Sequence, residues 1–233
     1  MTKEAENNEG KIRLITTDDG SHSLYVPALN ETYHSFHGAV QESRHVFIEM
    51  GLKYRINQGL KSAHIFEVGL GTGLNALLTA EFAFKYQIQI RFTSIEAFPV
   101  GYELVEQLNY ASYLEAPEAK SWFETIHKST WNEDVIINPF FTLHKVQAKL
   151  EEYQAPQNTF DIVFFDAFAP NKQAELWDLK ILSDIAQSMH PEGIFVTYCA
   201  KGQLKRDLQS LNLKVETLAG PPGKKEMVRA TKS

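Results

Sequence analysis

The sequence of 233 residues contains very little cysteine and no long apolar run. Cys199 is its only cysteine, so no intramolecular disulfide can form and no cysteine zinc site can be built. The first ten residues are polar and acidic and lack the apolar core of a signal peptide. No apolar run approaches the length of a membrane span. We therefore expect a cytoplasmic protein that does not enter a membrane.

The sequence also lacks an excess of positive charge. It has 23 Lys and Arg residues against 29 Asp and Glu residues, which gives a formal net charge of −6. Coating nucleic acid non-specifically requires a basic surface, so the composition argues against that class of protein. The composition is still compatible with a local basic patch on the surface of an otherwise acidic protein. The histidines show no ligand-like spacing with carboxylates, and we expect no metal site.

Short apolar runs and stretches of helical periodicity alternate along most of the chain. Residues 11–26 are expected to form a β-hairpin and residues 38–52 a helix. Strands are then expected at 64–68, 88–95, 140–146, 160–165, 193–198, 213–218 and 226–231, and helices at 74–86, 99–110, 117–127, 174–189 and 203–211. Strands that alternate with helices form a parallel sheet covered on both faces. Only the turn at residues 220–223 separates the last two strands, so that pair must be antiparallel.

This pattern is typical of the α/β, Rossmann-like class I methyltransferases. They have a mostly parallel seven-stranded sheet with an antiparallel C-terminal strand, whereas a nicotinamide Rossmann domain usually lacks the terminal hairpin. We divide the chain into a disordered tail (1–10), an N-terminal extension of hairpin and helix (11–60) and an S-adenosylmethionine-dependent methyltransferase domain (61–233).

A glycine-rich loop follows the first strand of the predicted domain and opens a helix. Its spacing is G-x-G-x-G, not the dinucleotide G-x-G-x-x-G, because position 74 is Leu. Glu67 enters the loop and would repel a pyrophosphate at the helix N-terminus. S-adenosylmethionine has no phosphate and carries an amino group and a sulfonium, so the carboxylate favours it. Taken alone, such a loop is also compatible with a plain strand-to-helix turn. The candidate cofactor residues here are Glu67, Gly69, Gly71, Gly73 and Asn75.

The ends of the next two strands supply further cofactor candidates. Glu96 can accept hydrogen bonds from both ribose hydroxyls. Phe98, which follows Ala97, can lie against the adenine. Many members of the methyltransferase superfamily carry an acidic residue after the third strand that contacts the adenine amino group. Here Gln147 is the candidate, because its amide oxygen can accept a hydrogen bond.

Asp166 ends the fourth predicted strand, which should neighbour the first. Methyl transfer needs a nucleophile with a free lone pair that is held in line with the methyl group. A carboxylate beside an amine can accept its N–H bonds, aim the lone pair and remove a proton. Phe168 can stack on a planar base, and the carbonyls of the turn to Pro170 can add acceptors. The alternative is that Asp166 only caps the helix that follows.

Two lysines follow the C-terminal turn, at Lys224 and Lys225. They lie near the same end of the predicted sheet as the glycine loop and can meet a phosphate. The alternative is a solvated hairpin turn.

Four parts of the chain resemble the methyltransferase module of the tRNA 5-methylaminomethyl-2-thiouridine biosynthesis family, in its stand-alone form. Residues 31–35 and 41–47 resemble its D-x-Y-x-S and E-[ST]-R-x-V-F motifs, and residues 66–75 resemble F-E-x-G-x-G-x-G-x-N. Residues 161–170 resemble F-D-x-x-F-x-D-x-F-x-P, followed by Trp177, and residues 224–227 resemble K-[RK]-E-M.

The resemblance implies methyl transfer from S-adenosylmethionine to the aminomethyl nitrogen of 5-aminomethyl-(2-thio)uridine at the tRNA wobble position. It implies that Asp166 is the catalytic carboxylate and that Tyr33, Glu42, the glycine loop and Glu96 surround the cofactor. The implied substrate contacts are Phe168, Pro170, Lys224, Lys225, Glu226 and Met227.

The resemblance also sets expectations for partners. They are the anticodon region of tRNA and a separate oxidase or upstream tRNA-modifying enzyme. The two-part family enzyme has a flavin-dependent oxidase module, but the chain is too short for one and has no second glycine fingerprint, so we expect no flavin. We expect a monomer. Because the chain is acidic, tRNA binding requires basic residues to collect on one face, namely Lys172, Lys201, Lys205, Arg206, Lys224 and Lys225.

Two other interpretations stay open. The first is a small-molecule amine methyltransferase, or an aminopropyltransferase that uses decarboxylated S-adenosylmethionine on a similar sheet. The second is a non-catalytic cofactor-binding partner of an oxidase. The residue patterns favour cofactor binding in each case, and the substrate depends on the motifs around Glu42, Asp166 and Lys224.

Overall fold

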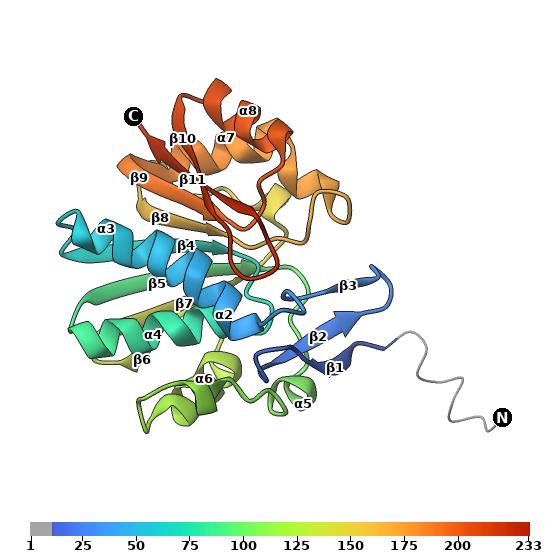
Figure 1. Ribbon diagram of the computed structural model, residues 1–233. Coiled ribbons are helices and arrows are strands. Elements are labelled where there is room, and N and C mark those ends of the chain that lie inside the picture. Colours follow the sequence, from blue (N-terminus) through green and yellow to red (C-terminus); the bar gives the residue numbers. More distant parts are fainter. Residues whose placement is uncertain (1–10) are drawn as a thin grey trace.

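The computed structural model describes residues 11–233. A mostly parallel sheet of eight strands carries helices on both faces, and a sheet of three strands lies beside one end of it (Figure 1). The expected α/β, Rossmann-like architecture is confirmed. The expected disordered tail, residues 1–10, lies outside the described residues.

The strand order of the large sheet is β10-β11-β9-β8-β4-β5-β7-β6. β4 pairs in parallel with both β5 and β8, so the expected pairing of the first and fourth strands is confirmed. β10 and β11 pair antiparallel, as expected, and β11 is also antiparallel to β9. The carboxyl ends of β4, β5 and β8 therefore lie side by side. The strands are β4 (Ser62–Val68), β5 (Gln89–Glu96), β6 (Asp134–Asn138), β7 (Phe141–Gln147), β8 (Phe160–Phe165), β9 (Met189–Thr197), β10 (Leu213–Ala219) and β11 (Glu226–Lys232).

β6 is the strand that adds to the seven expected ones. It pairs antiparallel with β7 and forms an edge of the sheet. Its apolar centre, residues 135–137, is short and is followed at once by Asn138 and Pro139. That turn reverses the chain, so a segment that resembled a connection becomes a hairpin strand.

Two layers of helices bury the faces of the sheet (Figure 1). α2 (Ala39–Ser43), the π-helix η1 (Arg44–Lys53), α3 (Tyr54–Asn57), α4 (Leu74–Tyr86) and α6 (Ala119–Lys128) belong to one side, and α7 (Leu179–Ser188) and α8 (Gly202–Ser210) to the other. The first core contains Phe47, Leu77 and Phe164, and the second contains Phe165 and Ile185. Since neighbouring residues of β8 enter opposite cores, the strand is apolar from Ile162 to Phe165.

The segment 99–110 is not the single helix that we expected. It forms one turn of helix, α5 (Tyr102–Val105), and a later 3₁₀ turn, η2 (Tyr110–Tyr113). Gly101 follows Pro99 closely and caps α5 in an extended conformation, which delays the helix. Val105 and Tyr110 are completely buried and anchor this irregular segment to the core. The helix expected at 174–189 likewise splits into a 3₁₀ turn, η4 (Ala174–Trp177), and α7.

The small sheet consists of β1 (Arg13–Thr16), β2 (His22–Val26) and β3 (Glu31–Thr32), and it confirms the expected N-terminal hairpin. Asp19 stabilises the turn between β1 and β2, because its side chain accepts a hydrogen bond from the backbone N–H of Ser21 at 3.0 Å. The same carboxylate accepts a hydrogen bond from the backbone N–H of Gln41 in α2 at 3.1 Å and so joins the turn to that helix. Leu24 is fully buried in the first core. The small sheet is thus joined to the main body, while the division of the chain at residue 60 stays a prediction. Within residues 11–233, no helix is both long and apolar enough to span a bilayer.

Candidate active site

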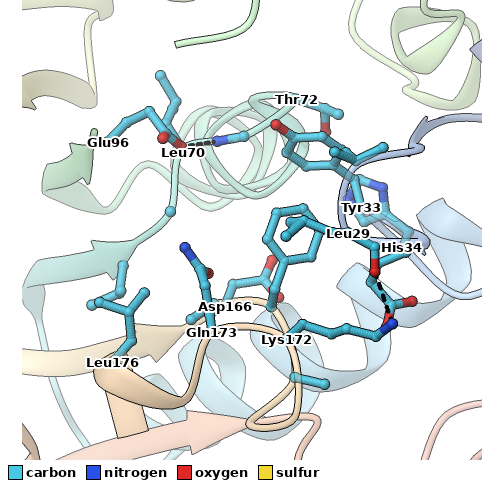
Figure 2. A pocket seen from close by; sticks show the side chains of 18 of the residues that line it. Leu29, Tyr33, His34, Leu70, Thr72, Glu96, Asp166, Lys172, Gln173 and Leu176 are labelled. Carbon is cyan, nitrogen blue, oxygen red and sulfur yellow. Dashed lines mark hydrogen bonds between the residues drawn. The ribbon is translucent and has the colours of Figure 1, made fainter. Parts of the chain in front are cut away.

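A cavity of about 840 Å³ opens at the carboxyl ends of β4, β5 and β8. The glycine loop, the end of β5, the loop after β8 and residues of the small N-terminal sheet line it (Figure 2). Its volume lies in the range of small-molecule sites, and its place matches the ligand crevice of open parallel sheets.

The glycine loop approaches this cavity with a backbone that only glycine adopts readily. Gly69 and Gly71 have φ values of +89° and +50°. A Cβ atom on Gly71 would lie 2.9 Å from Cδ1 of Tyr33, and one on Gly69 would lie 3.1 Å from the carbonyl oxygen of Asp166. These glycines therefore keep space open between the loop and its neighbours. Gly73 does not line the cavity, and a Cβ there would meet Nε2 of His127 at 2.5 Å.

Glu96 fixes the turn of this loop from the end of β5. Its Oε2 accepts a hydrogen bond from the backbone N–H of Gly71 at 3.0 Å, and its Oε1 accepts one from Phe98 at 2.9 Å. Glu96, Ala97 and Phe98 all line the cavity, and the side chain of Phe98 is exposed at its rim. A carboxylate held in this way presents its remaining lone pairs to a ligand.

Glu67 lies beneath the loop and is 1% exposed. Its Oε2 accepts a hydrogen bond from Oγ of Ser94 at 2.5 Å, whereas its Oε1 has no partner. Burial is the main cause that raises the pKa of Glu67 well above its usual value. Oδ1 of Asn75 is also buried without a partner. Buried acceptors without donors cost free energy, so a ligand that brings N–H donors to this loop fits the site.

Asp166 stands where β8 ends, beside the loop (Figure 2). Its Oδ2 accepts a hydrogen bond from Nδ2 of Asn75 at 2.8 Å. Burial, and then the negative charge of Glu42, raises the pKa of Asp166 to about 7, against the opposing effects of Asn75 and Lys224. Asp166 caps no helix, because Gln173 precedes η4 and Asp178 precedes α7. The capping alternative is therefore wrong.

Residues from the two ends of the chain meet on the other side of Asp166. Glu42 of α2 is 6% exposed, and its Oε1 accepts a hydrogen bond from the backbone N–H of Ser35 at 3.1 Å. Its Oε2 pairs with Nζ of Lys224. That Nζ also lies 3.9 Å from the ring centroid of Tyr198. All four groups, Asp166 included, line the cavity.

Aromatic side chains shape the wall between the loop after β8 and the N-terminal segment. The rings of Phe168 and Tyr33 meet edge to face, with centroids 5.1 Å apart. Trp177 donates a hydrogen bond from Nε1 to the carbonyl oxygen of Phe168 at 2.8 Å and so holds this loop.

Several expected site residues lie elsewhere. Gln147 is exposed at the end of β7 and does not line the cavity, because residues 148–151, including Glu151, take that place. Met227 is fully buried in the first core and cannot contact a substrate. Glu226 pairs with Lys205 at 2.9 Å, and Pro170 and Lys225 are absent from the lining. Lys224 lies in the turn before β11 and lines the cavity, whereas Lys225 is exposed.

Tyr198 is the site residue that the sequence patterns did not single out. It directly follows β9, and its hydroxyl donates a hydrogen bond to the carbonyl oxygen of Ala167 at 2.9 Å. Its position after a strand at the carboxyl edge was the available signal, although no motif contains it.

Lys172, which we expected to contact tRNA, instead makes internal hydrogen bonds. Its Nζ donates to the carbonyl oxygens of Leu29 and Asn30 at 2.8 and 3.2 Å.

The lining of the cavity is acidic overall. It includes six carboxylates and three lysines, which are Glu31, Glu42, Glu96, Glu151, Asp166 and Glu175 against Lys149, Lys172 and Lys224. Such a cavity favours cationic ligands. Among residues 11–233, no three His, Cys, Asp or Glu side chains are grouped so as to hold a metal ion.

Comparisons with known proteins agree with this geometry. A family model described as S-adenosyl-L-methionine-dependent methyltransferase matches residues 110–233. A tRNA 5-methylaminomethyl-2-thiouridine biosynthesis bifunctional protein from Idiomarina loihiensis is 27% identical, over 95% of this chain and 37% of its own length. The protein of the same name from Burkholderia multivorans is 28% identical, over 92% of this chain and 34% of its own length. The chain thus spans about a third of the length of these relatives.

A solved structure supports the fold. The crystal structure of MNMC2 from Aquifex aeolicus superimposes with a TM-score of 0.76 at 23% identity, and the match covers 99% of this chain and 77% of that one.

Proposed function

Since the chain belongs to the family of S-adenosyl-L-methionine-dependent methyltransferases, we propose that it methylates the aminomethyl nitrogen of 5-aminomethyl-(2-thio)uridine at the tRNA wobble position. The bifunctional relatives named above suggest this acceptor. The observation in this chain that carries the proposal is Asp166, which is held by Asn75 beside the glycine loop in an acidic cavity.

The residues around the glycine loop suit the cofactor. Gly69 and Gly71 leave the space that it needs, and Glu96 is held in place to receive the ribose hydroxyls. Asn75, which lines the cavity, offers an acceptor to its amino group. When bound, S-adenosylmethionine supplies a methyl group on a cationic sulfur, and transfer forms an N–C bond while the electron pair of the C–S bond returns to sulfur.

Asp166 is suited to prepare an amine acceptor. An ammonium group has no lone pair, so a proton must leave before transfer. A carboxyl group with a pKa of about 7 is a base of suitable strength near neutral pH. The side-chain amide of Asn75 fixes the orientation of its carboxylate. Asp166 therefore receives the proton of the acceptor amine and aims its lone pair.

Contacts with the tRNA would extend from the rim of the cavity. Phe36 is 56% exposed there and can stack on an unpaired base. Lys201, Arg206 and Lys225 are exposed and can meet phosphates, whereas Lys172, Lys205 and Lys224 make internal contacts. A tRNA substrate implies a cytoplasmic enzyme whose precursor is made by a separate oxidase or upstream tRNA-modifying enzyme. We expect it to act as a monomer without flavin or metal.

The acidic lining also favours a second candidate, a small polyamine acceptor. Incubation of the protein with labelled cofactor and either tRNA carrying 5-aminomethyluridine or polyamines separates the two. Nucleoside mass spectrometry of tRNA from cells that lack the gene is the decisive test. Accumulation of the aminomethyl uridine supports the proposal, and an unchanged nucleoside profile contradicts it.

A further inference from the structure

The ammonium group of Lys224 is held in the cavity by two groups that contact no other cation within residues 11–233. Its Nζ pairs with Oε2 of Glu42 and lies 3.9 Å from the centroid of the Tyr198 ring. A carboxylate on one side and an aromatic face on the other is a recurring way to bind an organic ammonium ion. The same cavity contains the Asp166 carboxylate, whose pKa responds to both Glu42 and Lys224.

We propose that Glu42 and the face of Tyr198 form the binding site for the ammonium group of the acceptor, and that Lys224 occupies this site until the acceptor displaces it. This inference rests on the proposed function, because it requires an amine acceptor. It assigns Glu42 and Tyr198 to substrate binding, whereas the sequence motifs placed Glu42 near the cofactor and did not include Tyr198.

Backbone groups hold both parts of this site, the Glu42 carboxylate and the Tyr198 ring, in place. Glu42 is 6% exposed, and its second oxygen is held by the backbone N–H of Ser35 at 3.1 Å. The hydroxyl of Tyr198 is held by the carbonyl oxygen of Ala167 at 2.9 Å, which fixes the ring. A buried carboxylate without a cation is costly, so the resting site favours an ammonium partner for Glu42. Lys224 is 30% exposed in its side chain and emerges from the Pro/Gly turn, so it can withdraw toward solvent.

The proton balance of the exchange is complete. The acceptor enters as R–NH₃⁺ and replaces the ammonium of Lys224 beside Glu42, so the charge near Glu42 does not change. One proton then passes from the acceptor nitrogen to the carboxylate of Asp166, which leaves R–NH₂ with a lone pair and Asp166 neutral. The nitrogen forms the new N–C bond, and the secondary ammonium product retains two N–H bonds with which to leave.

The test measures binding of the nucleoside 5-aminomethyluridine by calorimetry in the presence of S-adenosylhomocysteine. Lys224→Met removes the competing ammonium but keeps the length of the side chain, and Glu42→Gln removes the carboxylate. Lys180→Met is the matched control, because Lys180 pairs with Asp184 at 3.0 Å on α7 and does not line the cavity. If Lys224 fills the site about nine-tenths of the time, its removal tightens binding about tenfold. We expect weaker binding in Glu42→Gln and no change in Lys180→Met.

The neutral analogue 5-hydroxymethyluridine gives a second readout, since it should gain nothing from Lys224→Met. Circular dichroism and S-adenosylhomocysteine affinity establish that each variant is folded. Weaker or unchanged binding of the amine in folded Lys224→Met overturns the proposal. Weaker binding would mean that Lys224 assists acceptor binding, and unchanged binding would mean that Lys224 does not compete with the acceptor. Failure of the proposed function has a different outcome: the wild type would bind a small alkylamine such as putrescine, with the same response to Lys224→Met, but not the aminomethyl nucleoside.

Discussion

Replacing Asp166 with asparagine tests the proposed base through both activity and stability. The change keeps the size of the side chain and an oxygen that can accept the hydrogen bond from Asn75. It removes the group that would take the proton. We expect the rate of methyl transfer in a single turnover to fall about 100- to 10,000-fold, as is typical when a general base is lost. Affinity for S-adenosylmethionine should change little.

The stability of the same variant should rise. Burial raises the pKa of Asp166 from 3.8 to about 7, so the folded state disfavours the ionised carboxylate. The resulting loss of stability develops as the pH rises from about 4 to about 7 and is constant above that range. Full linkage gives roughly 4 kcal/mol, and we expect about 2 kcal/mol because the side chain faces a solvent-filled cavity. At about pH 8 the variant should therefore melt about 5 °C above the wild type, and below about pH 4 the two should coincide.

The assay follows labelled methyl transfer to tRNA carrying 5-aminomethyluridine, with thermal unfolding measured in parallel. Asp161→Asn is the matched control, because Asp161 is the carboxylate at the other end of β8 and accepts a hydrogen bond from the N–H of His64 at 2.8 Å. It should keep its activity and gain no stability. A normal transfer rate in Asp166→Asn refutes the reasoning about the base. Equal melting temperatures at about pH 8 refute the reasoning about the buried charge.

Three further predictions concern ligand contacts. Gly71→Ala should weaken S-adenosylmethionine binding about tenfold or more in calorimetry, because the φ of Gly71 is +50° and an added Cβ would lie 2.9 Å from Tyr33. The control is Gly59→Ala, since Gly59 has a φ of +103° and no atom within 4 Å of an added Cβ. This control should lower the stability of the protein but leave its affinity for the cofactor unchanged. Glu96→Gln should weaken the same binding about tenfold by removing one acceptor oxygen, and an unchanged affinity argues against a ribose contact. Affinity for tRNA should fall with salt, and Lys225→Ala should lower the log–log slope by about one; a flat response of the wild type contradicts phosphate contacts.

The positions of seven of the eight strands in the large sheet were predictable because each contains a short apolar run. The loop around Gly71 was predictable for a similar local reason, since its residues and their conformational requirement are adjacent in the chain. The break at 99–110 was harder to predict, because Val105 and Leu108 are buried three positions apart, a spacing that also suits a continuous helix. The π-helical form of residues 44–53 depends on packing against the sheet and has no local signal.

The residues of the candidate site were likewise predictable only in part. Asp166 directly follows β8 and Glu96 is the last residue of β5, so their position at the carboxyl edge could be inferred. Gln147 also ends a strand, but its side chain leaves the cavity, and the alternation at a strand end depends on register that the sequence does not specify. Tyr198 belongs to no motif, and its ring contacts Lys224, which lies 26 positions further along the chain.

The place of β11 between β9 and β10 has a consequence for protein synthesis. β10 leaves the ribosome before β11 but has no other partner in the sheet, and β9 keeps an open edge until β11 arrives. An open edge of this kind can pair with another chain. The contact of Glu42 with Lys224, which joins residues 182 positions apart, must wait for the same step. A chain that has been synthesised only as far as residue 223 therefore exposes the open edge of β9 and lacks the contact between Glu42 and Lys224.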